Sequence, residues 1–323
     1  MIEVKHLSRE YKVFEKESGI QFRRKRKTIT ALNDISFEVC EGRNIGVLGM
    51  NGAGKSTLIK LMCGIIAPTS GNVLVESKYV PFEKKKDYLR KISLVSGNKT
   101  QLNYDLSARD NFHFLGAIYG VSRETVNVRA EYLAARIEAG YLIDRQVRKM
   151  SFGERLKMEI VAALLHDPKY IFLDEPTIGL DVKTQDLLRK FIKDYNDGNR
   201  IVFITSHNLE DISQVCDDLL FINHGSVEYY GDLDSFCRIY STTCKIVLKV
   251  SLDRKENIIC YLLTSGIGDI EVLEDKIYFE IMREKQVEFV KKLMMNFPDD
   301  IINLDMRSSD VDEILKKKIL EEA

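Results

Sequence analysis

One short stretch constrains the fold of this chain more than any other: Gly-Met-Asn-Gly-Ala-Gly-Lys-Ser-Thr at residues 49–57. It matches the pattern G-x-x-x-x-G-K-[S/T], in which glycines let backbone N–H groups turn inward around a triphosphate. Residues 44–48 have the pattern of a buried strand, and residues 58–62 continue at helical spacing. The phosphates would lie at a helix N-terminus, so the sequence predicts a phosphate-binding loop rather than an ordinary glycine turn.

By itself this loop indicates a nucleoside triphosphate bound with Mg²⁺. Lys55 is expected to reach the β- and γ-phosphates, and the Ser56 hydroxyl is expected to ligate Mg²⁺. A triphosphate needs many donors at close range, which the whole loop can supply. The expected nucleotide contacts are Gly49, Asn51, Gly52, Ala53, Gly54, Lys55, Ser56 and Thr57.

Two carboxylates follow a second buried strand. Residues 170–173 form the continuous apolar run typical of a central parallel strand, and Asp174 and Glu175 come directly after it. Ligands of open α/β sheets bind at this edge. We therefore expect Asp174 to hold Mg²⁺ through water, and Glu175 to accept a proton from the attacking water as general base. The alternative is an acidic pair that caps a helix.

The composition excludes several other classes of protein. With 45% hydrophobic and 30% charged residues, the chain has the composition of a soluble globular protein, and its 323 residues suggest two domains. The net charge of -1 gives no general attraction to nucleic acid or to an anionic membrane. The six cysteines are scattered, which argues against a zinc site or a disulfide scaffold. No signal peptide and no membrane-spanning run are expected, so any work at a membrane would use a partner's spans.

The order of elements predicts an α/β domain over residues 1–235, with a helical subdomain at about 97–150. In that subdomain Phe112, Phe114 and Ile118 fall at helical spacing. Residues 243–323 are expected to form a small α+β domain with the ferredoxin-like order βαββαβ, followed by a charged helix from 309. The strands of that domain are expected at 244–250, 270–272, 276–281 and 301–306, and its helices at 256–264 and 285–295.

Between two predicted strands, residues 14–27 are polar and end in a basic run at 23–27. The sequence predicts a solvated loop here. Contact of the basic run with lipid headgroups or with another acidic surface is the alternative.

A third motif, Met-Ser-Phe-Gly-Glu at 150–154, lies shortly upstream of the acidic strand end. With it, the chain resembles the ATP-binding cassette (ABC) family over roughly residues 1–235. The family signature normally has the sequence Leu-Ser-Gly-Gly-Gln; Ser151 and Gly153 are kept, whereas Phe152 and Glu154 depart from it. The resemblance implies that ATP and Mg²⁺ are the cofactors, and that Ser151, Gly153 and Glu154 of one subunit close over ATP held by another.

Other positions match the family one by one. Tyr11 is similar to the aromatic residue that stacks on adenine, although a surface tyrosine is the alternative. Asp181 ends a stretch at 178–181 that resembles the D-loop, which crosses the dimer interface. His207 resembles the switch histidine that contacts the γ-phosphate. The resemblance therefore implies Glu175, His207 and Lys55 as the catalytic residues.

One family residue is replaced. The Q-loop glutamine, which contacts Mg²⁺ and relays the nucleotide state, should follow the strand at 92–96, and Asn98 stands there. Asparagine keeps the amide but is one methylene shorter, so the contact with Mg²⁺ could pass through water. Gln101 is the alternative for this role.

A narrower resemblance is to ATPase subunits of ABC-2-type exporters, within them to the multidrug or viologen-exporter-like group. The segments that carry it are the basic insert before residues 30–37, the stretch at 80–86 and the C-terminal domain. It implies a separate integral membrane permease docked on the helical subdomain, and a peripheral location on the cytoplasmic face of the cell membrane. Both halves of the ATP site are intact, which favours a homodimer and leaves a heterodimer open.

Two other classes of function are alternatives to an exporter subunit. A soluble ABC ATPase acting on nucleic acid, ribosomes or protein assemblies is disfavoured, because the chain has one cassette, no sustained heptads and near-neutral charge. No direct nucleic-acid binding is therefore expected. A phosphate-loop kinase would lack residues 151–154, Asp181 and His207 as a set. The C-terminal domain is expected to serve packing or dimerisation, with a small-ligand site as the alternative, and the cargo is not encoded in these residues.

Overall fold

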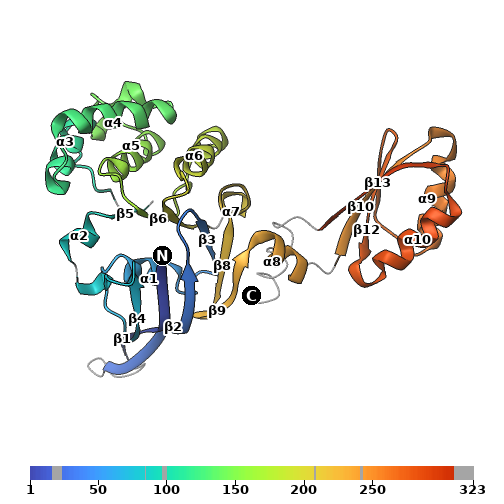
Figure 1. Ribbon diagram of the computed structural model, residues 1–323, viewed down its shortest axis with the longest axis horizontal. Coiled ribbons are helices and arrows are strands. Elements are labelled where there is room, and N and C mark those ends of the chain that lie inside the picture. Colours follow the sequence, from blue (N-terminus) through green and yellow to red (C-terminus); the bar gives the residue numbers. More distant parts are fainter. Residues whose placement is uncertain (17–23, 84, 97–99, 207–208, 241–242, 309–323) are drawn as a thin grey trace. The chain divides into compact units, whose positions relative to one another are not determined.

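The computed structural model describes residues 1–16, 24–83, 85–96, 100–206, 209–240 and 243–308 (Figure 1). The chain divides into two compact units, Met1–Asp232 and Leu233–Ala323. Among the described residues, no helix combines the length and the apolar character needed to span a bilayer.

A six-stranded sheet forms the centre of the first unit, in the order β5-β6-β7-β3-β8-β9. The strands from β5 to β8 are parallel, and β9 runs antiparallel to β8. Because parallel strands end at the same edge, the carboxyl ends of β3, β6 and β7 lie together there. The strands are β5 (Ile92–Ser96), β6 (Tyr170–Asp174), β7 (Ile201–Thr205), β3 (Asn44–Leu48), β8 (Asp218–Asn223) and β9 (Ser226–Asp232).

A second, antiparallel sheet has the order β2-β1-β4, with β1 (Ile2–Lys16), β2 (Arg24–Val39) and β4 (Ser70–Val75). Its first two strands form a long hairpin, in which Lys16 still pairs with Arg24. The prediction of a loop over 14–27 was therefore wrong in its extent. An antiparallel ladder is held by backbone hydrogen bonds, so a polar and charged composition does not prevent it from forming.

Helix α1 (Lys55–Met62) shares one hydrophobic core with both sheets. Leu58, Leu61 and Met62 are fully buried on this helix, and Tyr170 and Phe172 enter the same core from β6. The core therefore fixes α1, and with it the loop that precedes α1, against the central sheet.

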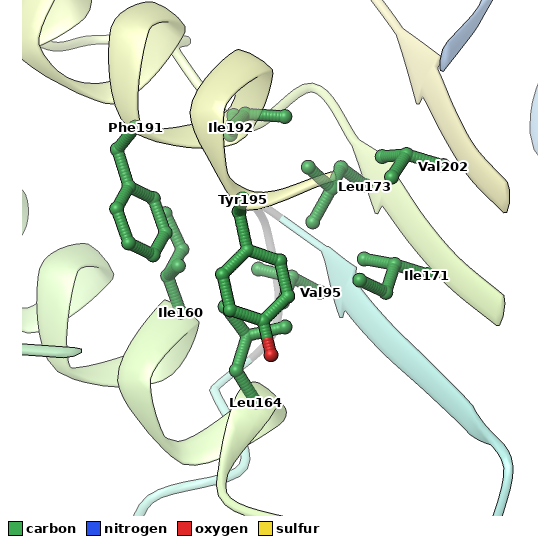
Figure 2. A pocket seen from close by; sticks show the side chains of 9 residues that line it. All are labelled: Val95, Ile160, Leu164, Ile171, Leu173, Phe191, Ile192, Tyr195 and Val202. Carbon is green, nitrogen blue, oxygen red and sulfur yellow. The ribbon is translucent and has the colours of Figure 1, made fainter. Parts of the chain in front are cut away.

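The opposite face of the central sheet is covered by α5 (Phe152–Leu164) and α6 (Val182–Tyr195). Ile171 and Leu173 point to this face, because successive side chains of a strand alternate. Figure 2 shows them packed against Ile160 and Leu164 of α5 and against residues of α6. The gap left between these apolar side chains is about 10 Å³, at the lower limit of the space that one water molecule needs, so it is a packing imperfection and no ligand site.

The helical subdomain consists mainly of α3 (Ala108–Tyr119) and α4 (Arg123–Arg136). Ser107 and Ser122 cap these helices, since each side chain accepts a hydrogen bond from a backbone N–H of the first turn. Phe112 is buried as its spacing predicts, but Phe114 and Ile118 are 62% and 60% exposed. Those two residues therefore form an apolar strip on the outer side of α3.

Short elements complete the first unit. At one end of the central sheet, the His166 ring lies with Nε2 2.9 Å from the Ile92 carbonyl of β5. A carbonyl only accepts, so Nε2 carries the hydrogen, and burial lowers the pKa of the imidazole. The short elements are η1 (Pro81–Glu83), α2 (Lys86–Leu89), η2 (Gly140–Leu142), η3 (Val147–Lys149) and α7 (Leu209–Val215).

The second unit begins with α8 (Leu233–Tyr240) and contains an antiparallel sheet of order β11-β12-β10-β13. Alternate residues of β10, such as Ile246 and Leu248, are buried with Phe279 in a core of its own. The predicted order βαββαβ is confirmed, whereas the helix expected from 309 lies outside the described residues. The elements are β10 (Thr243–Val250), η4 (Leu252–Arg254), α9 (Lys255–Thr264), β11 (Ile270–Leu273), β12 (Lys276–Met282), η5 (Arg283–Lys285), α10 (Gln286–Asn296) and β13 (Ile301–Ser308).

Candidate active site

The predicted phosphate-binding loop joins β3 to α1 and is pressed against neighbouring backbone. A Cβ at Gly49 would lie 2.1 Å from the Ile222 carbonyl oxygen, and one at Gly54 would lie 2.4 Å from the Ala31 carbonyl oxygen. Gly54 also has φ 111°, in the region that favours glycine. The expected contact residues all lie between the end of β3 and the first turn of α1: Gly49, Asn51, Gly52, Ala53, Gly54, Lys55, Ser56 and Thr57.

Replacing Gly54 by alanine should test how closely this loop is packed. We expect Gly54→Ala to lower the free energy of unfolding by about 1–3 kcal/mol, because a new methyl would overlap the Ala31 carbonyl. The matched control is Gly52→Ala, which has a similar φ of 84° but no atom within 4 Å of its Cβ. Thermal unfolding of both variants checks this, and equal losses would show that the packing of Gly54 is unimportant.

Lys55 lies inside the loop. Its Nζ donates to the carbonyl oxygens of Gly49 and Met50, at 2.6 and 3.1 Å, and the residue is only 7% exposed. Burial lowers the pKa of this ammonium, while the nearby carboxylates of Glu175 and Asp174 act in the opposite direction. A buried cation within a ring of loop backbone is the arrangement that a polyphosphate requires.

Asp174 and Ser56 are brought together across the edge of the sheet. The Ser56 hydroxyl donates to Asp174 Oδ1 at 3.3 Å, and the Thr205 hydroxyl donates to the same oxygen at 2.6 Å. A hydroxyl and a carboxylate side by side next to a phosphate site fit Mg²⁺, which takes one or two protein oxygens and completes its shell with phosphates and water. The described residues contain no group of three or more His, Cys, Asp or Glu side chains that could together hold a metal ion.

Glu175 follows Asp174 in an unusual backbone conformation. Its φ is 57°, in the left-handed region that few residues other than glycine adopt. Its backbone N–H donates to both the hydroxyl and the carbonyl oxygen of Thr205, at 3.1 Å each. The hydrogen bonds hold a strained turn at the end of β6, and strain of this kind is often found at functional sites.

The signature segment forms the N-terminus of α5. Ser151 is its N-cap: the hydroxyl accepts from the Glu154 N–H at 3.2 Å, and the Ser151 N–H donates to the Glu154 carboxylate at 2.8 Å. That backbone hydrogen bond lowers the pKa of Glu154, and Arg145 and Tyr141 also contact its carboxylate. Glu154 therefore fixes the helix start at which Ser151 and Gly153 are exposed or half-buried.

The D-loop candidate lies beside this helix start. A Cβ at Gly153 would lie 3.2 Å from Leu180 Cδ2, and one at Gly179 would lie 3.4 Å from the Phe152 ring. Asp181 is the N-cap of α6, and its carboxylate accepts from the Thr184 N–H and hydroxyl, which lower its pKa. The structure thus places the signature and the D-loop next to each other within one chain.

A buried polar network connects the D-loop to the end of β7. Arg189 of α6 is 2% exposed, and its Nε donates to the Asp211 carboxylate of α7 at 2.7 Å. The other Asp211 oxygen accepts from the hydroxyls of Thr177 and Ser206. Thr177 precedes the D-loop and Ser206 precedes His207, so one ion pair holds both segments. The Gln185 amide also donates to the carbonyl oxygens of Thr177 and Leu180, at 3.2 and 3.3 Å.

Comparison with known proteins identifies the family of this chain. A family model described as ABC transporter matches residues 32–178. NatA of Bacillus subtilis (strain 168), an ABC transporter ATP-binding protein, is 32% identical over 215 residues, which are 67% of this chain and 87% of NatA. The chain belongs to the ABC transporter family. It is an ATP-binding subunit of that family and an ATPase.

Two further similarities extend the ABC assignment. The linearmycin resistance ATP-binding protein LnrL of the same organism is 28% identical over 275 residues, which are 85% of this chain and 88% of LnrL. A solved structure described as the ATP binding subunit of an ABC transporter is 25% identical, with a TM-score of 0.62, and the match covers 74% of this chain and 92% of that one. The fold expected of an ABC ATPase is therefore confirmed.

Of the other site residues expected of an ABC ATPase, one lies on the antiparallel sheet and two lie outside the described residues. Tyr11 lies on β1, half-buried, with the Arg9 guanidinium 4.7 Å above its ring. Asn98 and His207 lie outside the described residues. Gln101, the alternative to Asn98, uses its side-chain amide to donate to the Leu94 carbonyl of β5 at 2.5 Å. That amide is therefore already engaged at the edge of the sheet.

Sequence reasoning missed several residues of this ABC site. Thr205 belongs to no motif and simply ends an apolar strand in the sequence. Only the pairing of β6 with β7, which sets Thr205 opposite Asp174, brings it next to the carboxylates. Arg189 and Asp211 have the appearance of surface charges in the sequence. Only the packing of α6 against α7 buries them, and no local pattern marks that packing.

Proposed function

We propose that this ABC ATPase powers an exporter, of the ABC-2 type, through a separate permease. The observation that carries the catalytic part is the convergence of Lys55, Ser56, Asp174 and Glu175 at one edge of the central sheet. The similarity to LnrL, named for linearmycin resistance, supports the export part. That similarity spans most of both chains.

The chemistry follows from the placement of these residues. Lys55 would neutralise charge on the β- and γ-phosphates as the terminal phosphoryl group leaves. Mg²⁺, held by the Ser56 hydroxyl and by Asp174, would supply further charge neutralisation. Glu175 would accept a proton from the attacking water. Thr205 would hold the Asp174 carboxylate and the Glu175 backbone in position through its hydrogen bonds with both. We assign Tyr11 to the adenine ring, His207 to the γ-phosphate and Asn98 to Mg²⁺.

The second half of each ATP site would come from another copy of the chain. Ser151 and Gly153 lie at a helix N-terminus that is open to solvent, a position suited to a phosphate. Both halves of the site are present in one sequence, so we propose a homodimer that closes on two ATP molecules. Asp181 and the D-loop would lie at its interface, beside the signature.

A permease would dock on the helical subdomain, at the cytoplasmic face of the membrane. Phe114 and Ile118 lie one turn apart on α3 and are more than half exposed. Exposed apolar side chains of this size gather at protein interfaces. We expect Phe114→Asp to lower recovery of the membrane partner at least about 10-fold, because a buried unpaired charge disrupts an interface. ATPase activity of the isolated chain should stay within about 2-fold.

The test is membrane fractionation of the Glu175→Gln chain, expressed from its own locus, with identification of what co-purifies. A stoichiometric integral membrane protein supports the exporter function, and Phe114→Asp should remove it. The control is Met295→Asp, which places the same charge at an 80% exposed methionine of the other unit. Recovery with ribosomes or nucleic acid and without a membrane protein would favour the soluble ABC ATPase instead.

A further inference from the structure

A second buried carboxylate lies on the signature helix and takes no part in the site described so far. Glu159 of α5 is only 4% exposed. Buried glutamates are rare unless a partner compensates the charge. Within the described part of the chain no lysine, arginine or histidine forms an ion pair with Glu159, so its compensation must come from elsewhere.

The compensation comes from one short segment of the chain, Thr100 to Leu102. The Gln101 N–H donates to both Glu159 oxygens, at 2.9 and 3.1 Å, and the Leu102 N–H donates to Oε1 at 3.3 Å. The Thr100 hydroxyl also donates to Oε1. A carboxylate that accepts several such donors depends on them, because their departure would leave a buried charge unpaired.

The contact between Glu159 and residues 100–102 matters because of where those residues lie in the sequence. Thr100 follows Asn98 by two positions, and Asn98 is the residue we assign to the chain's own Mg²⁺. Glu159 lies on the same helix as Ser151, a little over two turns further along at about 3.6 residues per turn. Glu159 therefore connects residues 100–102, which follow Asn98 in the sequence, to the helix that begins at the signature segment.

We propose that Glu159 is a positioning residue that locks residues 100–102 to the signature helix and thereby couples the two ATP sites of the dimer. This inference rests on the proposed function, since it needs a dimer that closes on ATP. The Gln101 side chain reaches in the other direction, to Leu94 of β5. Gln101 therefore links the central sheet to α5, and Glu159 holds it in that position.

The test compares Glu159→Ala with Leu164→Ala in the Glu175→Gln background. Leu164 is 3% exposed on the same helix and packs in the apolar cluster of Figure 2, so it controls for lost stability. We expect Glu159→Ala to raise the ATP concentration for half-maximal dimerisation about 10-fold, because a misplaced contact group weakens only the closed state. ATP affinity of the monomer should stay within about 2-fold.

Hydrogen exchange provides a second, independent readout. Amide exchange at Gln101 and Leu102 should accelerate about 10-fold or more in Glu159→Ala and stay unchanged in Leu164→Ala. Glu159→Gln keeps the size of the side chain and one acceptor oxygen, so its ATP-dependent dimerisation should lie between those of the parent and Glu159→Ala. Equal dimerisation of the Glu159→Ala and Leu164→Ala proteins would overturn the coupling.

The two proposals can fail separately. If the Glu175→Gln parent does not dimerise with ATP, the proposed function is wrong and the coupling falls with it. If the parent dimerises and Glu159→Ala leaves both dimerisation and amide exchange unchanged, only the inference about Glu159 is wrong.

Discussion

Glu175→Gln is expected to reduce steady-state ATP hydrolysis by about 10²–10⁴-fold, the contribution of a general base to such a reaction. The amide cannot accept the proton of the attacking water, but it keeps the size of the side chain and the backbone contacts with Thr205. ATP binding should survive, because Lys55 and the loop glycines are untouched. The protein should therefore accumulate as an ATP-bound dimer, measurable by phosphate release together with size-exclusion chromatography.

A matched control separates the chemistry from the backbone. Glu138 is exposed on the helical subdomain and has φ 50°, close to the φ of Glu175. Glu138→Gln makes the same isosteric change in the same left-handed conformation, so its hydrolysis should stay within about 2-fold of the parent. Retained turnover in Glu175→Gln would remove this residue from the role of base.

Arg189→Met is expected to lower the free energy of unfolding of the first unit by about 3–5 kcal/mol, as for other buried ion pairs that lose one partner. Among the described residues, the Asp211 carboxylate would keep the hydroxyls of Thr177 and Ser206 as partners while buried at 1% exposure. Denaturant unfolding, monitored by hydrogen exchange at residues 1–232, measures the loss of unfolding free energy in the first unit separately from the second unit.

The double variant Arg189→Met/Asp211→Asn provides the control for this ion pair. Once both charges are gone, no unpaired charge remains buried, so the double variant should lose less than the sum of the two single variants. The loss in the double variant should be about 1–3 kcal/mol smaller than the sum of the two single losses, the usual interaction energy of contacting residues. Strict additivity, or a loss in Arg189→Met below about 1 kcal/mol, would show that the ion pair contributes little to holding the D-loop.

The sequence predicted best where backbone geometry leaves few choices. Glycines at 49, 52 and 54 favour a tight loop, and a short apolar run that ends in Asp174 favours a buried parallel strand. The order βαββαβ of the second unit followed from the alternation of short periodic segments, each close to its predicted bounds. These patterns involve residues close together in the sequence, so they can be recognised without knowledge of the folded structure.

The sequence predicted worst where distant segments decide the outcome. The hairpin of β1 and β2 extends through residues whose composition is typical of a loop, because its ladder depends on pairing and not on side-chain type. Arg189, Asp211 and Glu159 are charged residues that no motif in the sequence marks as buried. Their burial depends on contacts between residues 22 to 58 positions apart in the sequence, which no periodicity reveals.

The contact between Gln101 and Leu94 has a consequence for the behaviour of the protein in solution. Strand β5 ends the central sheet, and its sequence Ile-Ser-Leu-Val-Ser is of a kind that readily joins another chain in an aggregate. The Lys91 carbonyl accepts from β6, so the alternate carbonyls of Ile92 and Leu94 point away from the sheet. His166 and Gln101 occupy both of them. Both carbonyls therefore already accept a hydrogen bond from the chain itself, which disfavours the pairing of a foreign strand along this edge of the sheet.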